Sequence, residues 1–265
     1  MLREGVLKGI IRPRTPPWKT SITKVESNSI ETRGYPQQDL IGSISYSQMV
    51  YLLLKESLPL PREEKMLQAV LVSFCDHGVT PPSTQAARVI ASSGSSLNAC
   101  IAGGLLAFGD NHAGAIELAM KMQQKGIKVA RESNLEIEEI AKIIVENFEY
   151  NQRKIPGFGH RYHHEDPRAQ KIHQLAEELE CYGEHMELVI QLQNILQESK
   201  GIKVNIDGAN AAVLSDLGFD WRFGCGLFMI GRLPGIIAHV YEELTQEKPF
   251  RKLFDMDKNN MINSF

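Results

Sequence analysis

Apolar residues recur at helical spacing along most of this chain. Leu67, Val70, Leu71 and Phe74 stand at positions i, i+3, i+4 and i+7, behind a proline and two glutamates at the expected helix start. Other stripes of the same period are bounded by capping residues or glycines, so the pattern predicts an almost entirely helical chain. The expected helices cover about residues 61–77, 83–93, 97–108, 113–125, 137–148, 166–179, 184–199, 207–218 and 221–246.

Only one segment alternates between polar and apolar positions. Residues 20–35 contain two short runs separated by a Ser-Asn-Ser turn, which predicts one small β-hairpin near the N-terminus. No strand–helix–strand alternation follows, and the glycines at 224 and 226 lack the third glycine and the preceding strand of a dinucleotide-binding loop. The pattern therefore predicts an all-α fold and argues against Rossmann and P-loop enzymes.

The expected helix 97–108 is unusually rich in small residues. It contains Gly103 and Gly104, although glycine inside a helix costs about 1 kcal/mol relative to alanine. Close approach of another helix would offset that cost, so we expect this helix in the middle of the core. Ser83 is predicted to cap the helix that begins there, and Gly126 to end the helix that begins near residue 113.

Composition narrows the class of protein. The 265 residues, 43% of them hydrophobic, suffice for a substantial core. A net charge of −3 and an isoelectric point of about 6.3 give no sign of binding to nucleic acid or a membrane surface. We expect neither a membrane-spanning helix, which needs roughly 18 apolar residues, nor a signal peptide in the basic N-terminal arm. Four separated cysteines are typical of reduced thiols in a cytoplasmic protein.

Titratable residues lie where the expected helices begin or end. His160 follows Gly157 and Gly159, whose backbone can approach a ligand closely. Arg161 is adjacent, and Arg168 lies in the first turn of the next helix. Two guanidinium groups near an imidazole suit a substrate with several carboxylates, because arginine binds a carboxylate through two hydrogen bonds. A loop histidine that caps a helix beside exposed arginines is the alternative.

Asp207, His77 and His112 form a second group of candidates. Asp207 stands at a helix start, where an aspartate is most often an N-cap and where the helix dipole lowers its pKa. It can act as a base if it points into a cleft. His77 and His112 each lie near an aspartate at a helix end, a position that the dipole alone can explain. The same residues are suited to proton transfer near neutral pH.

Arg232 lies in an otherwise apolar helix, so its charge requires either an internal acid or an anionic ligand. The sequence favours neither. A zinc site is a competing role for the histidines, but His77, His112 and His160 each lack a second ligand three or four residues away. No cysteine pair supplies one either, so we expect no metal site.

Short stretches of sequence around these candidate residues, taken in order and spacing, resemble the citrate synthase superfamily. Within it they resemble the citryl-CoA lyase branch, which includes the C-terminal module of ATP-citrate lyase. The resemblance runs from about Trp18 to Thr245. Each string alone is a weak signal, whereas the ordered set is specific. The strings are Arg33-Gly34-Tyr35-Pro36, Asp76-His77-Gly78, His112-Ala113-Gly114-Ala115, Gly157 to Arg161, Asp166-Pro167-Arg168-Ala169, Asn205-Ile206-Asp207, Gly231-Arg232 and Gly235 to His239.

The resemblance implies a citrate-synthase-like, two-domain helical fold. A large domain would comprise residues 1–112 and 223–265, and a small domain, residues 113–222, would carry part of the active site. The implied catalytic residues are His77, His112, His160 and Asp207, and the implied substrate-binding residues are Arg161, Arg168 and Arg232. The backbone of Ile155, Pro156, Gly157, Phe158 and Gly159 would hold coenzyme A.

The resemblance also implies an activity, the cleavage of citryl-CoA to acetyl-CoA and oxaloacetate. Coenzyme A would enter only as part of a substrate or product, with no permanently bound cofactor. The alternatives are a citrate or 2-methylcitrate synthase and a non-catalytic relative that binds CoA or a polycarboxylate. Synthases usually have His-Gly-Gly-Ala-Asn where this chain has residues 112–116, and they are longer. We expect a cytoplasmic homodimer or larger homo-oligomer that binds neither nucleic acid nor membrane.

Overall fold

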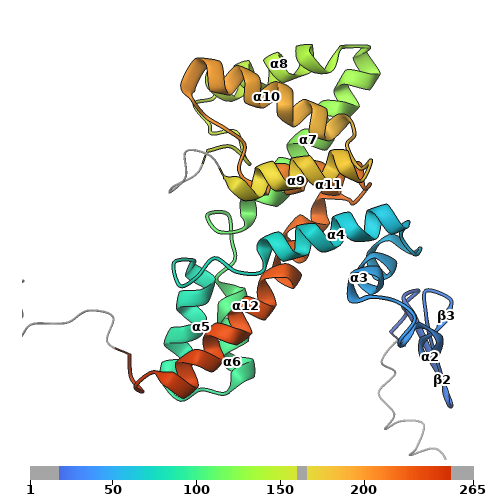
Figure 1. Ribbon diagram of the computed structural model, residues 1–265, viewed down its shortest axis with the longest axis vertical. Coiled ribbons are helices and arrows are strands. Elements are labelled where there is room, and N and C mark those ends of the chain that lie inside the picture. The colour runs from blue at the N-terminus through green and yellow to red at the C-terminus, as the bar shows by residue number, and fades with distance from the viewer. Residues whose placement is uncertain (1–17, 160–165, 252–265) are drawn as a thin grey trace, which may run out of the picture. The chain divides into compact units, whose positions relative to one another are not determined.

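The computed structural model describes residues 18–159 and 166–251 of the chain. By its internal contacts the chain divides into two compact units, residues 1–58 and residues 59–265. Figure 1 shows the elements of both units in chain order. The predicted partition into residues 1–112 with 223–265 and residues 113–222 stays a prediction.

The first unit contains the predicted hairpin and two helices. Strands β1 (Thr23–Glu26) and β2 (Ser29–Thr32) pair antiparallel, and β3 (Tyr35–Pro36) adds a short third strand beside β2. Helices α2 (Gln37–Leu40) and α3 (Tyr46–Lys55) follow. Ser45 begins α3 with a capping box, because its side chain accepts from Gln48 N–H while the Gln48 side chain accepts from Ser45 N–H.

The second unit is helical, as predicted. Its helices are α4 (Pro61–Phe74), α5 (Pro82–Ser92), α6 (Leu97–Leu106), α7 (Gly114–Ser133), α8 (Ile137–Tyr150), α9 (Pro167–Glu178), α10 (Glu184–Lys200), α11 (Ile206–Asp216) and α12 (Gly224–Gln246), the last preceded by the 3₁₀ turn η1 (Trp221–Phe223). Gly126 does not end a helix, which corrects the prediction. It lies inside α7, where an added Cβ would lie 3.0 Å from Ile144 Cδ1 and 3.1 Å from Leu188 Cδ2.

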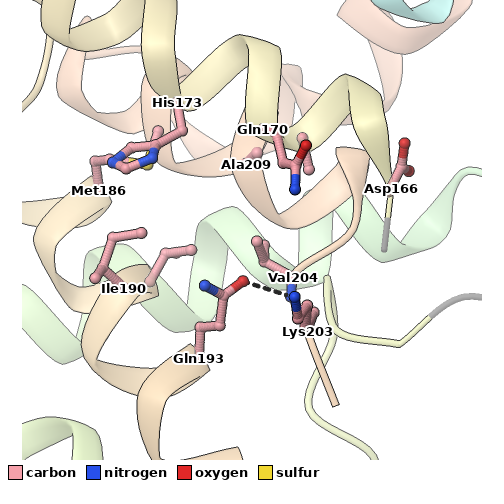
Figure 2. Close-up of a pocket in the computed structure, with 11 residues that line it drawn as sticks. Asp166, Gln170, His173, Met186, Ile190, Gln193, Lys203, Val204 and Ala209 are labelled. Carbon is pink, nitrogen blue, oxygen red and sulfur yellow. Dashed lines mark hydrogen bonds between the residues drawn. The ribbon is translucent and has the colours of Figure 1, made fainter. Parts of the chain in front are cut away.

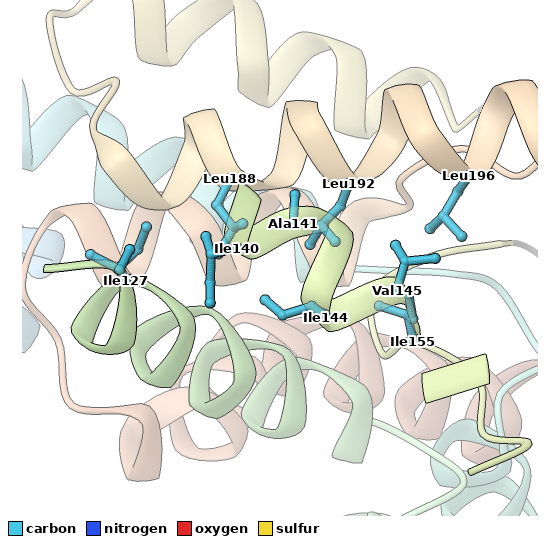
Figure 3. Close-up of a cluster of buried hydrophobic side chains, with 10 residues drawn as sticks. Ile127, Ile140, Ala141, Ile144, Val145, Ile155, Leu188, Leu192 and Leu196 are labelled. Atoms are coloured by element: carbon cyan, nitrogen blue, oxygen red, sulfur yellow. The ribbon is translucent and has the colours of Figure 1, made fainter. Parts of the chain in front are cut away.

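One buried apolar cluster joins α7, α8 and α10. Figure 3 shows the aliphatic side chains of these helices meeting between them, with Ile155 from the following loop at one end. Burial of each such side chain contributes about 1.5–3 kcal/mol. Gly126 belongs to the same interface, because only a residue without a side chain lets α7 approach α8 and α10 this closely. The cluster anchors the helices and the loop that precede the candidate site.

The small-residue helix α6 lies against α5 and α12, which confirms the expected close approach. A Cβ on Gly103 would lie 2.0 Å from Ile90 Cδ1, and a Cβ on Gly104 would lie 3.1 Å from the carbonyl oxygen of Ser83. A second apolar cluster, centred on Ala87, Cys100 and Ile236, fills the contact among these helices. The close packing holds the start of α5, and with it Ser83, in a defined place.

The segment Trp221–Gln246 is long and apolar enough to cross a membrane by length and composition, which corrects the expectation that no such run exists. Within the described part of the chain, however, α12 contacts α4, α5, α6 and α7. Its buried face includes Leu227, Ile236 and Val240. This packing is that of a core helix in a folded domain.

A buried charge cluster secures the C-terminal end of α12. Glu243, whose side chain is fully buried, accepts from Arg88 Nε at 2.7 Å and from Arg251 Nε at 2.6 Å. Burial would raise the pKa of Glu243, but the hydrogen bonds from Arg251 and Arg88 hold it below its ordinary value. Glu242 takes a further bond from Arg88 at 2.8 Å. The cluster joins α5, α12 and the residues that follow.

We expect Glu243→Gln to lower the free energy of unfolding by about 3 kcal/mol, because the buried Arg88 guanidinium then loses the carboxylate at its Nε. Urea unfolding measures the change. The matched control is Glu247→Gln, which removes a carboxylate from the half-exposed edge of the same cluster and should cost less than about 1 kcal/mol. Equal effects of the two substitutions would contradict the proposed importance of the buried carboxylate.

Candidate active site

The turn after α4 carries His77 and is held by α12. Asp76 Oδ2 accepts from Gly78 N–H at 3.1 Å, and Asp76 Oδ1 lies 3.0 Å from Nε2 of His239 on α12. His77 Nδ1 lies 3.3 Å from the Thr80 hydroxyl. Helix α4 ends at Phe74, so His77 lies beyond the helix and does not cap it. The turn presents His77 at the end of α4 nearest α5.

His112 lies in a tight turn between α6 and α7. Gly109 and His112 exchange backbone hydrogen bonds at 2.8 and 2.9 Å, and Ala113 takes a left-handed φ of +66°. A Cβ on Gly114 would lie 2.9 Å from the carbonyl oxygen of Gly109, so the turn closes only around glycine. A non-glycine residue in the left-handed region costs about 1–2 kcal/mol, which the rest of the turn must offset.

The imidazole of His112 is fixed on two sides. Its Nε2 lies 2.8 Å from the Ser83 hydroxyl, and its ring stacks on Phe108 with centroids 4.9 Å apart. Ser83 does not cap α5, because the N-cap is Pro81, which corrects the prediction. The buried hydroxyl instead holds a ring nitrogen of His112. A partner on one nitrogen determines which tautomer the other nitrogen presents.

Asp166 ties the start of α9 to the start of α11. As predicted, it is the N-cap of α9, accepting from Arg168 N–H at 3.1 Å. Its two oxygens also accept from Arg168 Nε at 3.0 Å and Nη2 at 2.9 Å, and from Ile206 N–H at 3.1 Å. Burial opposes ionisation of this carboxyl, yet these hydrogen bonds hold its pKa below the ordinary value. Asp166 therefore stays charged and aims the Arg168 guanidinium at α11.

Asp207 is not the cap of α11, which corrects the sequence expectation. The cap is Asn205, whose Oδ1 accepts from Asp207 N–H at 3.0 Å and Gly208 N–H at 3.2 Å. The carboxylate of Asp207 is thereby released from capping, and its Oδ1 is enclosed with no hydrogen-bond partner among the described residues. Burial raises its pKa to about 6 although Arg168 and Arg232 act in the opposite direction. The expected lowering by the helix dipole is smaller than the cost of desolvation.

Arg232 is 3% exposed, on the face of α12 that meets α4. Its Nε donates to the Phe74 carbonyl at 2.5 Å, and its guanidinium lies 5.0 Å from the centre of the Phe228 ring. Among the described residues no carboxylate forms a salt bridge with it. The structure therefore favours the second of the two sequence interpretations, in which the charge of Arg232 meets an anionic ligand.

These residues line one cavity. A volume of about 300 Å³ is bounded by His77, His112, Arg168, Asp207 and Arg232, with Gly159 at its edge. They come from the turn after α4, the α6–α7 turn, α9, α11 and α12, so segments separated by up to 155 positions converge. The size is at the lower end of ordinary ligand sites. The cavity thus brings together an acid with a raised pKa, two histidines and two arginines, the kinds of group that proton transfer on an anionic substrate uses.

Of residues 155–159, only Gly159 lines this cavity. Ile155 is buried in the α7–α8–α10 cluster, and Phe158 pairs with Val204. Gly157 and Gly208 touch backbone to backbone, since a Cβ on Gly208 would lie 2.3 Å from the Gly157 carbonyl oxygen. The loop thus braces the start of α11, and its predicted role in holding coenzyme A stays a prediction. His160 and Arg161 lie outside the described residues.

A second, smaller cavity of about 60 Å³ lies between α9, α10 and the segment before α11. Figure 2 shows His173, Met186 and Gln193 on its walls, with Gln193 accepting from the backbone N–H of Val204 at 3.1 Å. Its volume corresponds to a few water molecules rather than a substrate. The larger cavity is therefore the candidate active site.

Sequence reasoning overlooked several residues of the site. Asn111, Asn205 and Phe228 line the cavity, and Ser83 and Asp166 hold its functional side chains from behind. Asn205 stands two residues before Asp207, and asparagine is as good a cap as aspartate, so the cap was readable from the sequence. No sequence signal indicated the pairing of Ser83 with His112, which are 29 positions apart.

No group of three or more metal-ligating side chains occurs in the described ranges, 18–159 and 166–251. All four cysteines are free thiols, with Cys100 and Cys181 buried and Cys75 and Cys225 half-buried. Burial raises the pKa of the Cys100 and Cys225 thiols, so these two thiols are unreactive near neutral pH. Among the described residues, the titratable groups that line the cavity are imidazole, carboxylate and guanidinium groups.

The chain has a helical fold with a cavity lined by acidic and basic side chains, and comparison with known proteins gives the family. The model for "Citrate synthase, C-terminal domain" matches residues 59–253. The chain belongs to the citrate synthase family. A citrate synthase from Heyndrickxia coagulans is 32% identical over 223 residues, which are 82% of this chain and 56% of that protein. The chain thus spans about half the length of the curated relatives it matches.

Solved structures support the same assignment. A citryl-CoA lyase from Hydrogenobacter thermophilus is 46% identical, with a TM-score of 0.82 over 90% of this chain and 91% of that chain. An ATP citrate lyase from Methanothrix soehngenii, in complex with citrate and coenzyme A, has a TM-score of 0.78 over 95% of this chain and 42% of that chain. At 21% identity the second match shows the fold alone. The predicted citrate-synthase-like helical fold is confirmed.

The raised pKa of Asp207 makes a prediction about stability. The ordinary pKa is 3.8 and the folded value is about 6, so ionisation of Asp207 destabilises the folded state. The penalty is absent below pH 3.8, grows between pH 3.8 and 6, and is complete above pH 6. At about 1.4 kcal/mol per pKa unit it reaches about 3 kcal/mol. We expect Asp207→Asn to raise the free energy of unfolding by about 2–3 kcal/mol at pH 7.5 and to leave it unchanged near pH 4.

Urea unfolding at the two pH values measures this difference. The control is Asp39→Asn, which removes an exposed carboxylate in the first unit and should change stability by less than about 0.5 kcal/mol at both pH values. A destabilised Asp207→Asn protein at pH 7.5 would contradict the prediction, because it would mean that the carboxylate is better solvated or better paired than the site implies.

Proposed function

We propose that the protein cleaves citryl-CoA to acetyl-CoA and oxaloacetate. The observation that carries this proposal is the convergence of Asp207, His112, His77, Arg168 and Arg232 on one cavity. The 46% identity to a citryl-CoA lyase over nine-tenths of the chain favours the lyase over other reactions of the family. Coenzyme A then enters as part of the substrate and leaves as part of acetyl-CoA.

The two arginines match the free carboxylates of the substrate. Citryl-CoA carries two free carboxylates once the third has become the thioester, and oxaloacetate carries two as well. Arg232 is buried without a carboxylate partner among the described residues, so an anionic ligand would neutralise it. Asp166 holds the Nε and Nη2 of Arg168, while no described residue accepts from its Nη1, which can therefore bind a ligand. Fixing both carboxylates aligns the bond that breaks.

Cleavage requires one proton to leave oxygen and another to reach carbon. The tertiary hydroxyl gives its proton to His77 or His160 as the oxaloacetate carbonyl forms. The electrons of the broken C–C bond pass to the acetyl-CoA fragment as an enolate. Protonated Asp207 then donates its proton to the terminal carbon, which becomes the methyl group. A pKa of about 6 suits Asp207 to both giving and taking this proton near neutral pH.

His112 stabilises the enolate in this scheme. Ser83 holds its Nε2 at 2.8 Å and Phe108 supports the ring face, so the imidazole is oriented before the substrate arrives. A preoriented N–H donor directed at the thioester oxygen stabilises the charge that develops there, an effect worth about 3 kcal/mol in comparable sites. The neutral ring is the required form, since the enolate would deprotonate an imidazolium.

We also propose a cytoplasmic homo-oligomer as the working state. Exposed apolar side chains on the outer face of α12, Ile237, Tyr241 and Leu244, are suited to contact with a second copy. Size-exclusion chromatography with light scattering tests this proposal.

A citrate synthase is the second candidate, because the curated relative at 32% identity carries that name. The two activities share enolate formation and carbon–carbon bond chemistry. They differ in the thioester, which a synthase hydrolyses after condensation and a lyase leaves intact. The release of free coenzyme A therefore distinguishes them.

We expect purified protein to release oxaloacetate from citryl-CoA rapidly, with little free coenzyme A from acetyl-CoA plus oxaloacetate. A coupled malate dehydrogenase assay measures the first product and a thiol reagent the second. Asp207→Ala should lower turnover by more than 10³-fold, because the carbon then has no proton donor. Efficient release of free coenzyme A would identify a synthase, and ligand binding without turnover a non-catalytic relative.

Proton exchange isolates the role of Asp207. In D₂O, with acetyl-CoA and a four-carbon dicarboxylate that lacks the keto group, ionised Asp207 should exchange the methyl protons for deuterium. We expect the rate to fall about tenfold per unit below a pKa of about 6, because only the carboxylate can accept a proton. NMR of the methyl signal measures it, with Asp39→Asn as control. A rate that stays constant from pH 7.5 to 4.5, or normal exchange in Asp207→Asn, would exclude Asp207 as the base.

A further inference from the structure

One polar pair beside the cavity, an exposed Asp76 and a partly buried His239, has no role in the proposed mechanism. His239 on α12 bonds Asp76 in the turn that carries His77, and His239 does not line the cavity. Its Nε2 lies 3.0 Å from Asp76 Oδ1, and its Nδ1 faces Glu242 Oε2 at 3.7 Å, which is within ion-pair range but beyond hydrogen-bond distance. Glu242 is itself fixed by Arg88 at 2.8 Å. The imidazole thus has a defined orientation.

Helix α12 contacts the same turn at two further points. Arg232 Nε donates to the carbonyl of Phe74, the last residue of α4. Gly235 touches the turn directly, because an added Cβ would lie 2.3 Å from the Cys75 carbonyl oxygen and 3.1 Å from Asp76 Oδ1. Residues 232, 235 and 239 fall on one face of a helix, at spacings of three and four. The turn from 74 to 78 therefore lies along a single stripe of α12.

Asp76 links His239 on α12 to the turn that carries His77. Its Oδ2 accepts from Gly78 N–H at 3.1 Å, which closes a turn around His77. Burial of Asp76 would raise its pKa, but the bonds from Gly78 and His239 keep it below the ordinary value, so the carboxylate is ionised at neutral pH. Gly78 takes a φ of +66°, which fits a turn of fixed shape. The backbone turn that carries His77 is thus closed by a carboxylate that His239 holds.

We propose that His239 is a positioning residue: through Asp76 it fixes the turn that directs His77 into the cavity. This inference rests on the proposed function for its effect on turnover, whereas its effect on the place of His77 is independent of that function. A displacement of about 1 Å in a catalytic group can cost about a hundredfold in rate.

The test compares His239→Leu, which removes the bond to Asp76, with His239→Gln, whose amide can donate at the place of Nε2. We expect His239→Leu to lower kcat tenfold to a hundredfold with a smaller change in KM, and His239→Gln to recover most of the loss. Thr245→Val, which removes a local bond to the Tyr241 carbonyl on the exposed side of α12, should leave kcat unchanged.

A double-mutant cycle separates positioning from general damage. In a His77→Ala background, His239→Leu should cause no further loss of kcat, because the group that it positions is gone. Additive losses would overturn the proposal, as would a kcat of His239→Leu equal to that of the parent protein.

Side-chain NMR of His77 keeps the proposal testable if the protein does not act on citryl-CoA. We expect the ring signals of His77 in the ligand-free protein to shift in His239→Leu and to stay in place in Thr245→Val and His239→Gln. Unchanged His77 signals in a folded His239→Leu protein would overturn the positioning role. Absence of citryl-CoA turnover in the parent protein, with the signals shifted, would refute the proposed function alone.

Discussion

The carboxylate of Asp166 is the interaction on which the cavity most depends. One fully buried side chain caps α9, holds the Arg168 guanidinium through two bonds and receives the first N–H of α11. The last bond aligns α11 so that Asn205 can cap it and Asp207 can face the cavity. A single buried charge thus sets the relative place of Arg168, the proposed carboxylate ligand, and Asp207, the proposed proton donor. Its own ionisation is secured by the groups it organises.

Desolvation of Asp207 is the complementary constraint. The same enclosure that costs folding free energy raises its pKa into the range where an acid can both give and accept a proton. The neighbouring arginines limit the rise without forming a hydrogen bond to the enclosed oxygen. Stability is therefore reduced locally at the residue from which the proposed chemistry draws its reactivity, which is a common relation in enzyme sites.

Most of the fold was predictable because the local spacing of apolar residues indicates where the helices form. The stripes predicted the helices of the second unit, the Asp166-Pro167 start was correct to the residue, and the paired glycines at 103 and 104 indicated close packing. Gly126 was misread because a glycine that ends a helix and one that lets two helices touch have the same local sequence. Only the neighbouring Ile144 and Leu188 distinguish them, and they are distant in the chain.

The residues of the candidate site could be predicted from the sequence, but the contacts that hold them in place could not. His77, His112, Arg168, Asp207 and Arg232 carry visible chemistry, and the family resemblance grouped them. Their environment depends on long-range contacts that no periodicity encodes. Ser83 was assigned a cap because serine at a helix start usually is one, and the pKa of Asp207 was given the wrong direction because burial is a tertiary property.

The contact between Gly157 and Gly208 has a consequence for how such a site tolerates evolutionary drift. Main chain meets main chain at this contact, so the contact itself depends on no side-chain rotamer. Substitutions that repack the surrounding helices can accumulate without moving it, whereas a single methyl group at either glycine would displace it. The contact thus tolerates substitution at most positions of the chain but not at Gly157 or Gly208.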